Sequence, residues 1–144
     1  MPRADFYLIQ KPRFREEPLL LVCELARKAH EAGLPTLIFA RDAAQAEQLD
    51  DLLWSFDPDA FIPHQIAGAE GQDDDEEEAD VLIVAPGAEA AMRGLVINLR
   101  DEPVQGSLDR VLEVVPADES ARGPLRERWK QYQARGFDLK KHDM

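Results

Sequence analysis

The chain has 144 residues, of which 44% are hydrophobic, enough to fill a core and to exclude wholesale disorder. Its 17 Lys and Arg residues against 29 Asp and Glu residues give a formal net charge of −12, which argues against a broad coating of nucleic acid. No apolar run reaches the roughly 18 residues of a membrane span. The first residues lack the pattern of a secretory signal, and the single cysteine, Cys23, fits a reducing cytoplasm, so we expect a cytoplasmic protein.

Segments with strand composition alternate with segments of helical periodicity along the chain. In chain order we expect a strand at 4–10, a helix at 16–32, a strand at 36–40, a helix at 42–56, strands at 81–85, 95–99 and 111–115, and a helix at 124–135. Gly33 and Gly136 stand where left-handed helix ends are expected, and Asp42 stands where an N-cap is expected. This alternation indicates one α/β domain over residues 1–144, a Rossmann-like three-layer sandwich with a mainly parallel sheet.

The charge is unevenly spread along the chain. Eight acidic residues and no basic one lie between Glu70 and Asp80, which predicts a solvated acidic loop at about 68–80. From Arg122 to Lys141 the balance reverses, with seven Lys and Arg residues against two acidic ones. An overall acidic chain therefore ends in a basic segment, and such a patch can capture a short acidic ligand.

The residues of a catalytic or nucleotide site are missing from the sequence. The chain contains no GxxxxGK phosphate loop, no GxGxxG after a strand and no serine in a GxSxG context. His30, His64 and His142 lack the spacing of metal ligands, and Cys23 lies on the apolar stripe of a helix, as a buried thiol would. We therefore expect no catalytic residue, no cofactor, no metal and no functional nucleotide site.

An aromatic cluster follows the second predicted helix. Residues 52–64 contain three aromatic residues and two prolines, with Trp54 and Phe61 the most prominent. These side chains either plug the end of the sheet or form an exposed apolar patch of the kind found at protein interfaces. The residues alone leave both interpretations open.

A second cluster lies on the last predicted helix. Arg126, Trp129 and Lys130 are spaced i, i+3 and i+4 and therefore share one face, which Arg122 joins if the helix begins before Pro124. Cations beside an indole suit a ligand that has both a carboxylate and an aromatic ring. The same residues would also suit a solvated basic helix end that complements the helix dipole.

Several stretches resemble, in order along the chain, the chi subunit family of bacterial DNA polymerase III. The opening ADFYLIQ, the segment DDLLW followed by FIPH, and the pattern RERWKxYxxxGF carry the resemblance most specifically. The resemblance implies a non-catalytic protein, similar to Rossmann or helicase-like α/β domains that lack a working nucleotide site.

The same resemblance implies an accessory subunit of the clamp-loader complex in DNA replication. Such a subunit bridges the psi subunit, and through it the clamp loader, to the acidic C-terminal tail of single-stranded DNA-binding protein, which ends in Asp-Phe-Pro-Phe. It implies a psi interface at Trp54 and Phe61. It implies a tail site at five further residues: Val115, Arg122, Arg126, Trp129 and Lys130.

Two other interpretations compete with this family assignment. Neither they nor the family assignment implies a membrane partner. A small α/β nucleotide-binding or enzymatic domain would use the ends of the sheet strands, although its phosphate loop is missing. Direct DNA binding through the basic C-terminal segment is disfavoured by the overall charge of −12 but open locally.

Overall fold

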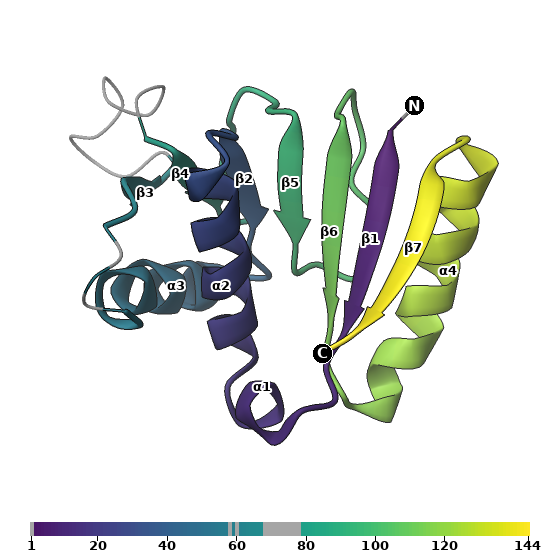
Figure 1. Ribbon diagram of the computed structural model, residues 1–144. Coiled ribbons are helices and arrows are strands. Elements are labelled where there is room, and N and C mark those ends of the chain that lie inside the picture. Colours follow the sequence, from purple (N-terminus) through teal and green to yellow (C-terminus); the bar gives the residue numbers. More distant parts are fainter. Residues whose placement is uncertain (1, 58, 60, 68–78) are drawn as a thin grey trace.

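The centre of the computed structural model, which describes residues 2–57, 59, 61–67 and 79–144, is a seven-stranded parallel sheet (Figure 1). Its strand order is β3-β4-β2-β5-β6-β1-β7. The strands are β1 (Arg3–Leu8), β2 (Thr36–Phe39), β3 (His64–Ile66), β4 (Val81–Val84), β5 (Leu95–Asn98), β6 (Arg110–Val115) and β7 (Asp138–Asp143). The helices are α1 (Pro12–Glu16), α2 (Pro18–Glu31), α3 (Ala43–Ser55) and α4 (Arg122–Ala134), with the short 3-10 turn η2 (Glu119–Ala121) before α4.

Helices cover both faces of the sheet and create two separate cores. Helices α2 and α3 pack on one face and α4 on the other, which confirms the α/β, Rossmann-like sandwich with a parallel sheet. Neighbouring strand residues point to opposite faces, so Ile38 joins the first core and Leu37 the second. Strands covered on both sides must be apolar throughout, which is why TLIF, VLIV and LVIN are continuous hydrophobic runs.

The helix ends follow the expected chemistry. Gly33 and Gly136 have φ values of +73° and +85°, the left-handed conformation that a residue without Cβ adopts at low cost. The Asp42 carboxylate accepts a hydrogen bond from the Gln45 amide at 2.7 Å and so caps α3. Helix α4 begins at Arg122, two residues before the expected start, because Pro124 fits within a first turn, where its missing N–H has no helical partner.

Among the described elements, α1, β3, β7 and the short turn η2 were not expected from the sequence. The polar segment DLKKHD forms β7, whose residues are mostly exposed, because it pairs along its whole length with β1 at the edge of the sheet. The first and last strands of the chain therefore lie side by side (Figure 1). The acidic loop expected at about 68–80 lies, up to residue 78, outside the described residues. Among the described helices, none combines the length and apolarity needed to cross a membrane.

A buried ion pair joins α4 to the sheet. The Glu113 carboxylate of β6 lies 2.9 Å from Nε of Arg128, and their side chains are 0% and 4% exposed. Tyr132 and Asn98 donate hydrogen bonds to the other carboxylate oxygen at 2.6 and 2.8 Å. Burial raises the pKa of Glu113 to about 7, although Arg128 opposes this shift. Arg128 belongs to the basic segment of the sequence, but its side chain is part of the interior.

The same network holds the loop between β5 and β6. The Arg128 guanidinium donates to the carbonyl of Asp101 at 3.0 Å, and the Tyr132 hydroxyl accepts from the amide of Val104 at 2.8 Å. One end of each contact is on α4 and the other is on the loop. The position of α4 against the sheet is therefore set by polar contacts as well as by packing.

We expect Arg128→Met to lower the free energy of unfolding by about 3–5 kcal/mol, because it leaves the Glu113 carboxylate buried without its charge partner. The double variant Glu113→Gln/Arg128→Met should lose less than Arg128→Met alone, since the uncompensated charge is then removed. Urea denaturation of the three proteins measures both effects. A loss below about 1 kcal/mol for Arg128→Met would contradict the anchoring role given to this pair.

Candidate functional site

The outer face of α4 borders an apolar cavity. The cavity has a volume of about 290 Å³ and is lined by Phe6, Leu8, Leu125, Arg126, Trp129, Lys130 and Lys141. The i, i+3, i+4 spacing brings Arg126, Trp129 and Lys130 together, as the sequence indicated. Arg128 and Tyr132 turn toward the sheet, and Trp129 lies beside them, half-buried against the second core. Arg126 and Lys130 are exposed next to it.

The floor and the rim of this cavity differ in character. The half-buried Trp129 indole packs against Phe6 of β1, with ring centroids 5.1 Å apart and planes tilted by 51°. Arg126 and Lys130 are exposed on the rim, and no carboxylate among the described residues pairs with either. An apolar cavity with unpaired cations on its rim can bind a ligand that is apolar at one end and anionic at the other.

The other two residues expected at this site line a neighbouring groove. Val115 and Arg122 border a second hollow of about 290 Å³, which also includes Arg15 of α1. Leu8 and Leu125 line both hollows, so the two adjoin, with Trp129 at the first and Val115 at the second. The structure therefore places Val115 and Trp129 at adjoining hollows rather than around one pocket, because Val115 is on β6 whereas the cavity floor is formed by the neighbouring strand β1.

Trp54 and Phe61 are exposed. Their exposed fractions are 58% and 70%, and their ring centroids lie 6.1 Å apart. Below them His64 is held by the carbonyls of Ile62 and Asp50 at 2.7 and 3.1 Å, and its ring lies 4.7 Å from that of Trp54. Of the two interpretations left open by the sequence, the structure supports the exposed aromatic patch and not the plug.

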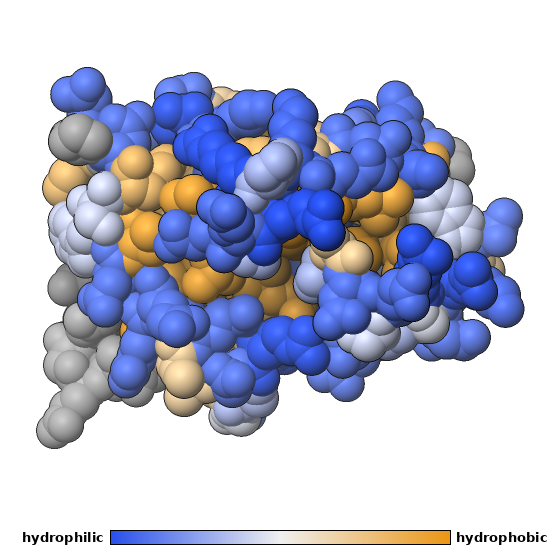
Figure 2. Space-filling model, turned by 90° about the horizontal axis from the view of Figure 1, so that it is seen from below, coloured by the Kyte–Doolittle hydropathy of each residue, from blue (hydrophilic) through white to orange (hydrophobic). Residues whose placement is uncertain are grey.

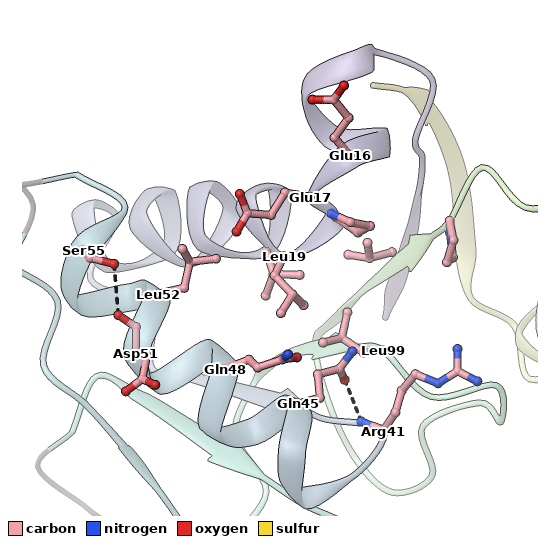
Figure 3. A pocket seen from close by; sticks show the side chains of 14 residues that line it. Glu16, Glu17, Leu19, Arg41, Gln45, Gln48, Asp51, Leu52, Ser55 and Leu99 are labelled. Carbon is pink, nitrogen blue, oxygen red and sulfur yellow. Dashed lines mark hydrogen bonds between the residues drawn. The ribbon is translucent and has the colours of Figure 1, made fainter.

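A larger cavity lies where the sheet strands end, between α2 and α3 (Figure 3). It has a volume of about 560 Å³, with Leu19, Leu52 and Leu99 among its apolar lining residues. Figure 2 shows this side of the molecule, where hydrophobic side chains lie in hollows framed by hydrophilic ones. Parallel α/β folds bind nucleotides at such strand ends, so this cavity tests the nucleotide interpretation.

The lining of this larger cavity does not fit a phosphate. Glu16, Glu17 and Asp51 supply three carboxylates, and Arg41 pairs with Asp101 at 3.1 Å. Carboxylates repel the oxygens of a phosphate, and the chain has no glycine-rich loop to supply backbone donors. The geometry gives no support to a nucleotide site here.

Buried titratable groups elsewhere have structural partners. Asp5 is fully buried, and although burial by itself would raise its pKa, hydrogen bonds from His142, Arg3 and Arg110 hold that pKa below the ordinary value. These contacts join β1, β6 and β7. Within the described part of the chain, no group of three or more His, Cys, Asp or Glu residues could hold a metal ion.

Two cationic residues at these hollows were not identified from the sequence. Lys141 lines the apolar cavity and Arg15 lines the neighbouring groove. Both belong to elements, β7 and α1, that the sequence pattern did not predict. Lys141 was counted in the basic segment, but nothing in its spacing related it to Trp129.

Comparison with known proteins gives one family. A family model described as the DNA polymerase III chi subunit, HolC, matches residues 1–140. The chain is 34% identical to the DNA polymerase III subunit chi of Pseudomonas aeruginosa, over 99% of this chain and 96% of that protein. It is 33% identical to the corresponding subunit of Escherichia coli, over 96% of each chain.

The fold is also similar to a solved domain of a DEAD-box protein. The C-terminal domain of the DEAD-box protein Dbp5 superposes with a TM-score of 0.68 at 14% identity, covering 99% of this chain and 90% of that one. At that identity the likeness describes the fold alone. It agrees with the Rossmann-like architecture.

We expect Cys23 to be unreactive in the folded protein, because it is fully buried and burial raises the pKa of its thiol to about 12. Modification by a disulfide reagent at pH 8 should be on the order of 100-fold slower than that of free glutathione, and should become fast in denaturant. Absorbance of the released thiolate measures both rates. Fast modification of the native chain would contradict the inert role of this residue.

Proposed function

The chain belongs to the chi subunit family of DNA polymerase III, and we propose that it acts there as an adaptor without catalytic chemistry of its own. One partner is the psi subunit, through which it is connected to the clamp loader. The other partner is the acidic C-terminal tail of single-stranded DNA-binding protein. The observation that carries the proposal is the apolar cavity at α4, with free cations at its mouth and an indole in its wall.

In the tail site, each end of the ligand has a matching surface. The last phenylalanine of the tail enters the cavity that Phe6 and Trp129 line. Its terminal carboxylate is held at the rim by Arg126 and Lys130, which no described carboxylate neutralises. Capture of a chain end through its carboxylate and last side chain is a recurrent mode of peptide recognition.

The psi site uses the exposed Trp54 and Phe61. Two large aromatic side chains that are 58% and 70% exposed and in contact range of each other have the character of interface anchors. They lie beside α3 and β3, at the opposite end of the sheet from α4 and β7 (Figure 1). Both partners can therefore bind one molecule at the same time.

A weak tail contact suffices for this task. Many copies of the tail are present where single-stranded DNA-binding protein coats the lagging strand, and a high local concentration raises occupancy without added contacts. Rapid release also lets the polymerase assembly move along the coated strand.

We expect Arg126→Ala and Trp129→Ala each to weaken binding of a peptide ending in Asp-Phe-Pro-Phe by about tenfold or more, since each removes a principal contact. Amidation of the peptide's terminal carboxylate should weaken binding comparably. Fluorescence anisotropy with a labelled peptide measures these affinities, and wild-type binding should fall as salt rises from about 50 to about 500 mM.

Lys28→Ala is a suitable control for this experiment, because Lys28 is exposed in the last turn of α2, away from both hollows. Its affinity should equal that of the wild type. Wild-type affinity in Arg126→Ala and Trp129→Ala, with folding intact, would eliminate the proposed tail site.

We expect Trp54→Ala and Phe61→Ala to lose co-purification with psi while keeping wild-type affinity for the tail peptide, because both rings are surface anchors far from α4. Leu34→Ala is the matched control, since Leu34 is also an exposed apolar residue, at 45%. Retained psi binding with lost tail binding would exchange the two sites.

A further inference from the structure

We propose that the tail site has a second cationic half, built by Lys141 of β7 and Arg15 of α1, that binds the acidic residues preceding the tail's last phenylalanine. This inference rests on the proposed function and deepens it. The apolar cavity and the neighbouring groove would then form one trough that binds both the chain end and the acidic residues before it.

Lys141 reaches the cavity because of the register of the edge strand. Lys141 pairs with Phe6 of β1, and Phe6 is part of the cavity floor. Paired residues of neighbouring strands project to the same face of a sheet, so Lys141 stands on the side of α4. Its neighbour Lys140 pairs with Asp5 and therefore projects to the opposite face.

Arg15 reaches the adjoining groove from the other side. It is exposed on α1 and lines the groove together with Arg122 and Val115. Leu8 and Leu125 line both hollows, so the groove continues directly into the apolar cavity. Of the described residues that line either hollow, Asp118 alone is acidic, and its carboxylate caps η2 by accepting from the Ser120 amide at 3.0 Å.

The cations of this trough lack the carboxylate partners that six arginines have elsewhere in the chain. In the described residues, no carboxylate pairs with any of the five cations that line the two hollows. The five are Arg15, Arg122, Arg126, Lys130 and Lys141. By contrast, six other arginines each lie within salt-bridge distance of a carboxylate. They are Arg3, Arg13, Arg27, Arg41, Arg110 and Arg128.

This contrast matters because the chain is strongly acidic, with a net charge of −12. Six of its twelve arginines pair with carboxylates, whereas the five cations that line the two hollows have no carboxylate partner among the described residues. Such a patch lowers the energy of an anionic segment laid along it, and the effect adds up over several charges. The apolar cavity holds the aromatic end of the ligand, so its upstream carboxylates extend along the groove toward Arg122 and Arg15.

The test compares variants that remove a cation of the trough with control variants that remove a cation from the same strand or helix outside the trough. Lys141→Ala and Arg15→Ala should each weaken binding of a peptide with several acidic residues before Asp-Phe-Pro-Phe by roughly two- to fivefold, as expected for exposed charge pairs. Lys140→Ala and Arg13→Ala are the matched controls, since Lys140 projects to the other sheet face and Arg13 pairs with Glu24 at 3.4 Å. Both controls should bind as the wild type does.

A second peptide, with its upstream acidic residues replaced by serine, locates the contact. With this peptide Arg15→Ala should have no further effect, whereas with the acidic peptide it weakens binding. Equal affinity of all four variants for the acidic peptide, while Trp129→Ala abolishes binding, would overturn this inference and leave the proposed function intact. No binding of either peptide to the wild type would instead overturn the proposed function.

A single-stranded oligonucleotide of matched charge supplies the last comparison. We expect the oligonucleotide to bind more weakly than the acidic peptide, and we expect Trp129→Ala to leave its affinity unchanged. Tighter binding of the oligonucleotide, with losses in Lys141→Ala and Arg15→Ala, would overturn the inference and assign the cations to nucleic acid.

Discussion

The buried contact between Glu113 and Arg128 fixes how α4 faces the sheet, and the surface of that helix depends on it. The two side chains are almost fully buried and 2.9 Å apart. Because Arg128 and, one turn later, Tyr132 point into the interior, the rotation of α4 about its axis is fixed. That rotation places Arg126, Trp129 and Lys130 at the cavity beside the helix. A buried pair of this kind adds little net stability, but misplacing either partner is costly, so it selects one rotation of the helix.

A parallel sheet then brings distant parts of the chain to that helix. Strand β1 supplies the cavity floor through Phe6, and β7 from the far end of the chain supplies Lys141 beside it. Helix α1 follows β1 directly and contributes Arg15 to the same side. The trough is thus assembled from three segments that meet only because the first and last strands are neighbours in the sheet.

The arrangement agrees with the proposed role as an adaptor. The exposed aromatic pair, Trp54 and Phe61, and the cationic trough lie at opposite ends of one sheet (Figure 1). Between them lies the Rossmann-like sheet, and the cavity at its strand ends is lined by the carboxylates of Glu16, Glu17 and Asp51.

The sequence alone determined the features that depend on neighbours along the chain. Continuous apolar runs identified β2, β4 and β5, single residues such as Asp42 and Gly136 identified helix ends, and i, i+3, i+4 spacing identified the face of α4 that carries Trp129. Only the tertiary structure decided that DLKKHD is a strand, that Arg128 is buried and Arg126 is not, and that Trp54 is exposed. A charged segment becomes a strand only through hydrogen bonds to a partner, and here that partner lies at the other end of the chain.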